Sequence, residues 1–318
     1  MRKSLGVLIG ATLVLAAPGS VLAHGAAAPA PSFPGVLLEW RFEPVVLAAL
    51  ALAAIGWWLL IRRVDGAHHP HPHPRSRQLA FLGGLAAIAI ALTSPIEAYE
   101  GELFSVHMLQ HMLLELVAAP LLLLGAPATL ALRAATPSVR RRLLTILHSR
   151  VVSVISFPLL GWVVFAAVNW GWHFSTLYNQ ALETPWLHDL QHMTFLGAAL
   201  LFWWPVIGAD PARWRLPYPV RLFYLFLAMP QNSFLGIALM SAPAALYSHY
   251  VTNGRTWGPS PIDDQSIGGM LMWVGGDVVF LLAMGLVVAA WVRAEDRRTA
   301  RDDAREDARL AGIQPPAE

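Results

Sequence analysis

Long stretches of apolar residues constrain this chain more than any other feature. Beyond the N-terminal region, seven segments reach or approach the ~20 residues that an α-helix needs to cross a bilayer. They lie at about residues 41–61, 78–95, 103–125, 151–172, 186–207, 219–240 and 266–292. A backbone in lipid must satisfy its own hydrogen bonds, so such segments predict helices. We therefore expect an all-α fold, a polytopic transmembrane helical bundle with seven spans.

The N-terminus has the three parts of a secretory signal peptide. Arg2 and Lys3 form the charged region, an apolar core follows, and Val21-Leu22-Ala23 resembles a cleavage site. The alternative is an uncleaved anchor. The expected organisation is a signal peptide at 1–23, a periplasmic segment at 24–40, a seven-helix membrane domain at 41–292 and a charged cytoplasmic tail at 293–318.

Arginine is distributed very unevenly between the loops. Nearly every arginine after residue 40 lies in one set of alternate loops or in the tail, and the opposite set holds only Arg41 and Arg255. Cytoplasmic loops carry the excess of positive charge in membrane proteins. The Arg-rich loops and the C-terminus are therefore predicted to be cytoplasmic, and the mature N-terminus is predicted to be periplasmic.

The chain has no cysteine but twelve histidines. The absence of cysteine excludes disulfides, iron–sulfur clusters and thiolate metal sites. Any metal site must therefore use histidine, methionine, carboxylates or backbone oxygen. A run of His and Pro at residues 68–74 could collect metal ions, or it could be a solvated linker that its prolines keep extended.

Two predicted spans carry the same short motif near their outer ends. Residues 107–112 read HMLQHM and residues 188–193 read HDLQHM. Histidines four residues apart share one helix face, so two such pairs could meet and hold one ion. Imidazoles suit copper or zinc, or a two-metal site, more than magnesium or calcium. The predicted ligands are His107, His111, His188 and His192. A polar packing network and a haem site are the alternatives.

Further residues could join or support this site. His173, at the end of the fourth predicted span, and Met270, early in the last one, are candidate ligands. Three carboxylates inside or beside spans are candidate supports, because charged groups in lipid usually mark a site. They are Glu115, Asp264 and Asp277. The alternative role of Glu115 is an internal hydrogen bond, and that of Asp264 and Asp277 is a helix cap or an internal hydrogen bond.

The chain resembles the CtaG family of cytochrome c oxidase assembly factors in three segments. They are His107-Met-Leu-Gln-His-Met-Leu-Leu, Val117-Ala-Ala-Pro-Leu-Leu-Leu-Leu-Gly-Ala-Pro127 and Asp264-Gln-Ser-Ile-Gly-Gly-Met-Leu-Met-Trp. The resemblance covers roughly residues 40–292 and concerns the polytopic type, not the single-span chaperone that depends on cysteine. It implies a multi-pass protein of the bacterial inner membrane that helps to mature haem–copper oxidases.

These observations together predict an assembly factor without enzymatic activity. It would bind copper near the outer face and pass the ion to an oxidase subunit or another assembly factor. Its expected partners are these proteins and the lipid bilayer, and no nucleic acid. The alternatives are a copper transporter with Glu115 and Asp277 along its path, a haem b redox protein, and a structural scaffold. Pro120 is expected to loosen the third span below its histidine pair.

Overall fold

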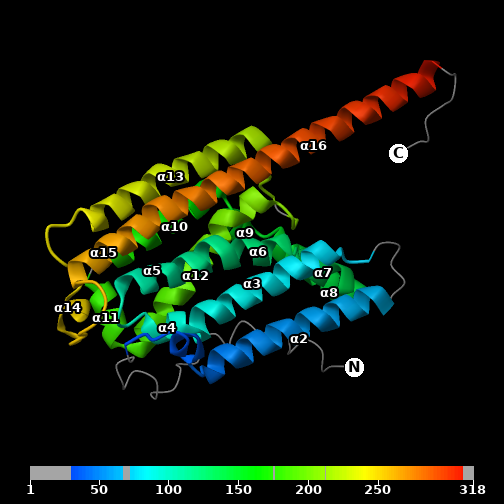
Figure 1. Ribbon diagram of the computed structural model, residues 1–318. Coiled ribbons are helices and arrows are strands. Elements are labelled where there is room, and N and C mark those ends of the chain that lie inside the picture. The colour runs from blue at the N-terminus through cyan, green and yellow to red at the C-terminus, as the bar shows by residue number, and fades with distance from the viewer. Residues whose placement is uncertain (1–29, 67–71, 175, 212, 311–318) are drawn as a thin grey trace.

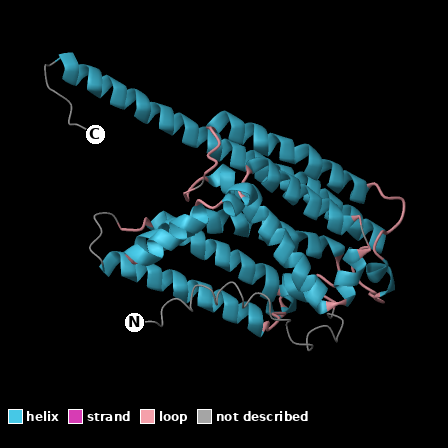
Figure 2. Cartoon of the chain, turned by 180° about the vertical axis from the view of Figure 1, so that it is seen from behind, coloured by secondary structure: helices cyan, strands magenta, loops and turns pink. Residues whose placement is uncertain are grey.

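The computed structural model describes residues 30–66, 72–174, 176–211 and 213–310. These residues form a bundle of long helices joined by short helices and loops (Figures 1 and 2). No strand occurs in these ranges, so the predicted all-α fold is confirmed. The predicted signal peptide at 1–23 and residues 68–71 of the His/Pro run lie outside them.

Within the described ranges, six helical stretches are long and apolar enough to cross a membrane. Their elements are α2 (Pro44–Gly66), α3 (Arg75–Thr93) with α4 (Pro95–Tyr99), α5 (Phe104–Met112) with η3 (Leu113–Ala118), α6 (Ala119–Leu124) and α7 (Pro127–Ala134), α12 (Pro185–Ile207), α13 (Tyr218–Met240), and α15 (Pro261–Met270) with η4 (Leu271–Gly275) and α16 (Gly276–Leu310). They correspond to six of the seven predicted spans.

The segment predicted as a span at 151–172 is divided in two. It forms α9 (Arg150–Ile155) and α10 (Pro158–His173), because Pro158 lacks an N–H group and disfavours a helical residue before it. The 16 residues of α10 extend about 24 Å, short of the ~30 Å of a bilayer core. Seven spans are therefore not confirmed. α10 packs closely on α12, where a Cβ atom added to Gly161 would lie 2.7 Å from the carbonyl oxygen of Leu201.

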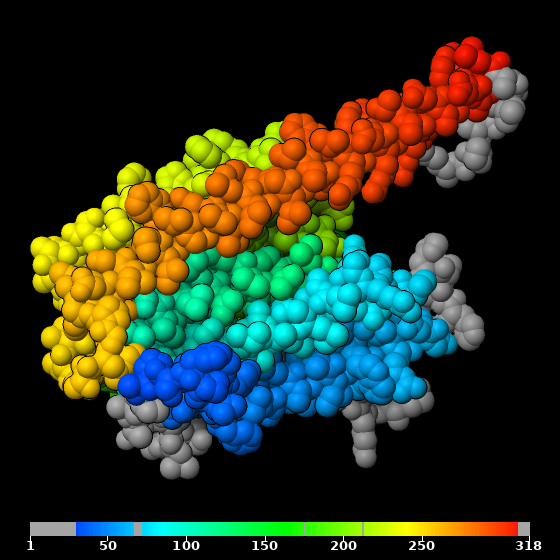
Figure 3. All heavy atoms as spheres, viewed as in Figure 1, coloured from blue at the N-terminus to red at the C-terminus, as the bar shows by residue number. Residues whose placement is uncertain are grey.

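Short helices gather at the two ends of the bundle (Figure 1). At one end, α4, α11 (Leu177–Glu183) and α14 (Ser248–Thr252) lie near the first residues of α5, α12 and α15. At the other end lie α7 and α8 (Pro137–Leu147), and the charged last part of α16 extends beyond the bundle (Figure 3). Both histidine motifs therefore lie toward the first of these ends.

Two of the spans widen into a π-helical turn, η3 after α5 and η4 after α15. Pro120 accounts for η3, because it has no N–H group to donate and its ring displaces the preceding turn. In η4, the carbonyl oxygen of Met272 accepts a hydrogen bond of 2.7 Å from Nδ2 of Asn232 on α13. The predicted loosening near Pro120 thus takes the form of one wide turn directly below the histidine pair.

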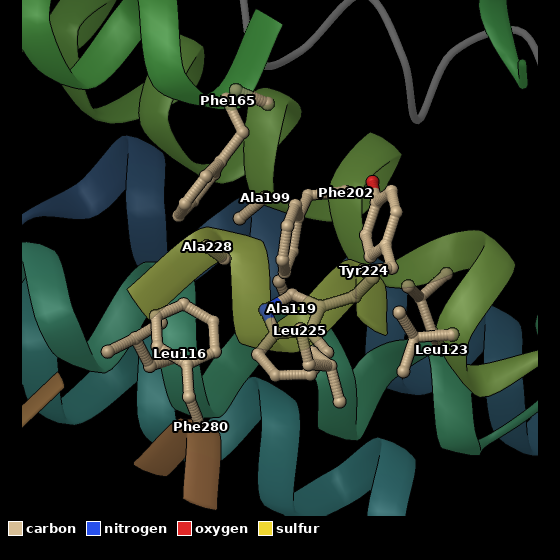
Figure 4. Close-up of a cluster of buried hydrophobic side chains, with 13 residues drawn as sticks. Leu116, Ala119, Leu123, Phe165, Ala199, Phe202, Tyr224, Leu225, Ala228 and Phe280 are labelled. Carbon is tan, nitrogen blue, oxygen red and sulfur yellow. The ribbon is translucent and has the colours of Figure 1, made fainter. Parts of the chain in front are cut away.

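The main apolar core lies farther along the same helices, below the histidines. In Figure 4, Phe165, Phe202 and Phe280 converge from α10, α12 and α16 with smaller side chains between them. The rings of Phe165 and Phe202 stack with centroids 4.6 Å apart. Nε1 of Trp203 donates 2.9 Å to the carbonyl oxygen of Glu115 in η3. This packing fixes α5 and α12 side by side and so positions their first turns.

Candidate metal centre

The four predicted histidines lie in one buried cluster between α5 and α12. Ring centroids are 4.3 Å apart for His107 and His111, and 4.2 Å apart for His188 and His192. Across the two helices, His107 lies 5.2 Å from His188 and His111 lies 5.5 Å from His192. All four side chains are buried. The prediction that imidazoles from two helices meet in one place is therefore confirmed.

Two overlapping groups in this cluster have the spacing that a metal ion needs. One contains His107, His111 and His192, and the other contains Glu100, His107 and His188. Within each group the potential ligand atoms all lie within 4.8 Å of one another. Imidazole with carboxylate is a donor set for transition-metal ions. His107 is common to both groups, so it is the centre of the arrangement.

Several nitrogens of these imidazoles have no hydrogen-bond partner. Within the described residues, Nε2 of His107 and both ring nitrogens of His111 are buried and unpartnered. A buried polar atom without a partner costs about 1–3 kcal/mol, so such atoms are rare in folded proteins. A bound cation would satisfy them, and the residues present therefore fit a metal ion.

Glu100 is the member of the cluster that sequence reasoning missed. It lies between α4 and α5, and its Oε2 is 3.3 Å from Nδ1 of His107 and 3.6 Å from Nε2 of His188. Burial raises the pKa of this carboxyl to about 8, although nearby Arg41 acts in the opposite direction. Glu100 precedes the first residue of α5, so the helical spacing that links His107 and His111 could not reveal it.

Two further side chains contact the histidines and hold them in place. Gln110 donates from Nε2 to the carbonyl oxygen of Ala91 at 2.9 Å and to Oε2 of Glu97 at 2.6 Å, and its Oε1 lies 3.0 Å from Nε2 of His192. Tyr250 on α14 lies with its hydroxyl 3.0 Å from Nδ1 of His107. Gln110 thus bonds between helices.

Aromatic side chains enclose the cluster. The ring of Tyr178 is 5.3 Å from that of His107, and the ring of Phe195 is 4.3 Å from that of His111. The rings of Phe104 and Tyr247 pack against that of Tyr178. This wall limits water, which strengthens any electrostatic interaction with an ion.

The two additional predicted ligands lie in different places. His173 is buried beside the cluster, with Nδ1 2.7 Å from the carbonyl oxygen of Asn169 and Nε2 3.4 Å from Sδ of Met108. It belongs to neither of the two groups found in the described residues. Met270 is 47% exposed, and its role as a ligand stays a prediction.

The three predicted supporting carboxylates have partners outside the cluster. Glu115 accepts a hydrogen bond of 3.0 Å from Nδ2 of Asn169, and Asp277 accepts one of 2.8 Å from Ser233. Asp264 is fully buried and accepts from the backbone N–H of Phe104 at 2.6 Å. It therefore caps α5 and not its own helix, whose cap is Ser260. These three contacts each join two neighbouring helices of the bundle.

The chain was compared with known proteins. A family model described as cytochrome c oxidase caa3 assembly factor matches residues 54–294. Uncharacterized proteins of Mycobacterium bovis and Mycobacterium tuberculosis are each 35% identical over 292 residues, which is 88% of this chain and 43% of theirs. One of Mycobacterium leprae is 32% identical over 280 residues, 86% of this chain and 42% of its own. The chain thus spans less than half the length of these relatives. No solved structure matches it.

Proposed function

The chain belongs to the family of cytochrome c oxidase caa3 assembly factors, and on this premise we propose that it holds copper during the assembly of a haem–copper oxidase. The copper would be cargo, passed to an oxidase subunit or to another assembly factor by exchange of ligands. No bond-making catalysis is part of this proposal. The buried cluster of histidines on α5 and α12 is the site at which the ion would be held.

One observation carries the proposal: His107 and His111 present buried nitrogens without hydrogen-bond partners, within ligand distance of His192. A cluster kept only for packing would pair these atoms, because unpartnered polar atoms destabilise a buried site. Imidazoles bind copper, zinc, iron and nickel. The family's link to an oxidase that contains copper selects among these ions.

The position of the two groups suggests the direction of transfer. His188 lies about one helical turn, ~6 Å, nearer the end of the bundle than His192, and Glu100, which precedes α5, lies beside His188. A partner that docks at this end would meet Glu100 and His188 first. The ion would therefore leave His111 and His192 and pass these two residues on its way out.

We place this end of the protein at the periplasmic face of the bacterial inner membrane. Its support is the distribution of arginine, since α8 carries Arg140, Arg141 and Arg142 at the opposite end, where the charged part of α16 also lies. Such clusters are typical of the cytoplasmic side. The C-terminus would then be cytoplasmic.

Metal analysis of the purified protein tests the proposal. Protein purified in detergent from cells grown with copper should contain about one copper ion per chain, as expected for one such site. The double variant His107→Ala/His192→Ala should contain almost none. His148→Ala is the matched control, because His148 is exposed on the opposite end of the bundle and should leave the copper content unchanged. Copper-free wild-type protein, or equal copper in all three, would contradict the proposal.

A second measurement separates copper handling from a scaffold. In cells that carry the double variant, the oxidase subunits should be present while the copper content of the oxidase and its activity fall. If both remain at the wild-type level, the histidines are dispensable and a purely structural role is favoured.

A further inference from the structure

His107 and His192 can each bind an ion through only one nitrogen at a time. A neutral imidazole has one nitrogen that carries hydrogen and one that carries a lone pair, and only the latter is a ligand. In both residues one ring nitrogen lies at hydrogen-bond distance from another side chain. The partner of that nitrogen therefore decides which nitrogen is left for the ion.

For His192 the partner is Gln110. The carbonyl oxygen of Ala91 can only accept, so the amide group of Gln110 that lies 2.9 Å from it must be the NH₂ group. The same NH₂ group faces Oε2 of Glu97 at 2.6 Å, which uses its second hydrogen. The atom of Gln110 facing His192 is then Oε1, an acceptor, at 3.0 Å from Nε2. Nε2 of His192 must carry hydrogen, and Nδ1 keeps the lone pair.

For His107 the partner is Tyr250. The hydroxyl of Tyr250 has a single hydrogen, which it donates to the carbonyl oxygen of Glu100 at 3.0 Å. Toward Nδ1 of His107, also 3.0 Å away, the hydroxyl oxygen can only accept. Nδ1 must therefore carry hydrogen. The lone pair of His107 is left on Nε2, the buried nitrogen that has no partner in the described residues.

The contacts of Gln110 and of Tyr250 both lead to one short segment, residues 97–100. The side chain of Glu97 accepts a hydrogen bond from Gln110, and the backbone carbonyl of Glu100 accepts one from Tyr250. The side chain of Glu100 lies beside His107. Contacts beyond the ligands commonly set the tautomer and ring orientation of a metal-binding histidine.

We propose that Gln110 and Tyr250 are positioning residues that fix the tautomers of two copper ligands. The ion is then bound by Nδ1 of His192 and Nε2 of His107, together with a nitrogen of His111. The identity of the ion rests on the proposed function, whereas the tautomers are properties of the metal-free protein.

The metal-free protein tests the tautomers directly. NMR of protein labelled with ¹⁵N in histidine distinguishes a nitrogen that carries hydrogen from one with a lone pair, and the signals are assigned with His107→Ala and His192→Ala. We expect hydrogen on Nδ1 of His107 and on Nε2 of His192. In Gln110→Leu the signals of His192 should show a mixture of both tautomers, and in Tyr250→Phe those of His107 should change in the same way.

The affinity for Cu(I), measured by competition with a coloured chelator, is the second readout. Removing such an outer contact typically weakens metal binding about 10- to 100-fold, which is the expected loss in Gln110→Leu and Tyr250→Phe. Gln191→Leu is the matched control. Gln191 occupies the same place in the other motif and is fully buried, but neither of its amide atoms has a hydrogen-bond partner in the described residues. Its substitution should leave the affinity unchanged.

Gln110→Glu is a second variant, used in case Gln110→Leu fails to fold. It keeps an acceptor for Nε2 of His192, so it should retain the wild-type tautomer. The inference is overturned if either histidine has the opposite tautomer, or if both substitutions leave tautomers and affinity unchanged. Wild-type protein that binds no Cu(I) would contradict the proposed function instead, while the NMR result on the metal-free protein would still decide the tautomers.

Discussion

His107 differs from the other histidines because it has no exposed surface and belongs to both groups of potential ligands. His111 and His188 each belong to one group only. The four histidines, which form two equivalent pairs in the sequence, are therefore not equivalent in the fold. His111 lies against Phe195 in the interior, whereas His188 lies near the carboxylate of Glu100.

Replacing these two histidines should have unequal effects on copper affinity. His111→Ala removes a ligand from the inner group and should weaken Cu(I) binding by about 100-fold or more, as loss of a direct ligand exceeds the loss of an outer contact. His188→Ala leaves that group complete and should weaken binding by less than about 10-fold. Competition titrations of the two variants measure the difference, and equal losses would show that all four imidazoles hold the ion together.

Glu100 should make the stability of the metal-free protein depend on pH. Its pKa of about 8 exceeds the ordinary value of 4.5, so between these values the folded protein keeps a proton that the unfolded protein has lost. The free energy of unfolding therefore decreases as the pH rises from about 5 to 8. The thermal midpoint in detergent should fall by several degrees over this range, and by less in Glu100→Gln. Parallel curves for the two proteins would contradict this assignment.

The sequence predicted the histidine cluster better than the residues that contact it. Histidines four residues apart inside apolar spans were recognisable from helix geometry alone. Tyr250 could not be recognised, because 143 residues separate it from His107 and only the fold brings them together. Met270 was assigned from its residue type and its place in the chain, but neither reveals which face of the helix it occupies.

At the scale of the elements, the first turn of α5 depends on a side chain from α15. Asp264 accepts hydrogen bonds from the backbone N–H of Phe104 and from the hydroxyl of Ser105, at 2.6 and 2.5 Å. Asp264→Ala would leave these donors buried without an acceptor and should cost about 1–3 kcal/mol. Asp263→Ala is the control, since Asp263 is exposed and its side chain accepts a hydrogen bond from Ser260 on the same helix end. Thermal unfolding compares them, and equal midpoints would contradict the cap.

The crossing of α13 and α15 depends on glycine. A Cβ atom on Gly236 would lie 2.6 Å from the carbonyl oxygen of Gly269 and 2.8 Å from the backbone nitrogen of Trp273. Backbone atoms cannot move aside without separating the helices, so Gly236→Ala should destabilise the protein by about 1–3 kcal/mol. Gly285→Ala has open space around the new methyl group and should be neutral in the same unfolding assay. Equal stability of both variants would show that the contact is looser than it appears.

The positions of the long helices were predictable, but their interruptions were less so. Apolar length located the first residue of each of six spans to within about five residues, whereas two of these helical stretches continue well past their predicted ends. Pro158 marked the break between α9 and α10, yet the apolar residues on both sides of it favoured one continuous span. Neither π-helical turn was predicted as such, because Pro120 signals a disturbance without fixing how many residues the wide turn contains.

At the scale of the whole molecule, the two ends of the bundle have different chemistry. The histidine cluster lies toward one end, and the arginines of α8 and α16 lie at the other (Figure 1). A chain without cysteine allows the orientation to be measured with single introduced thiols. Thr252→Cys on α14 and Ser138→Cys on α8 place exposed thiols at opposite ends. In intact spheroplasts an impermeant maleimide should label the first and not the second. The reverse result would invert the proposed orientation.

The wide turn η3 has a consequence for how the two halves of the third span face their neighbours. Each residue turns an α-helix by about 100°, so in an unbroken helix Leu116, Ala119 and Leu123 would point well away from His107 and His111. One additional residue accommodated in the π-helical turn cancels that offset, and all of them face inward together. The extra residue of the π-helical turn thus keeps the histidine cluster and the apolar core on the same side of the span. If the same residues formed a regular helix, the histidines would be rotated by about 100° relative to the core, whereas deleting one residue between positions 113 and 118 would leave a regular helix in the same register.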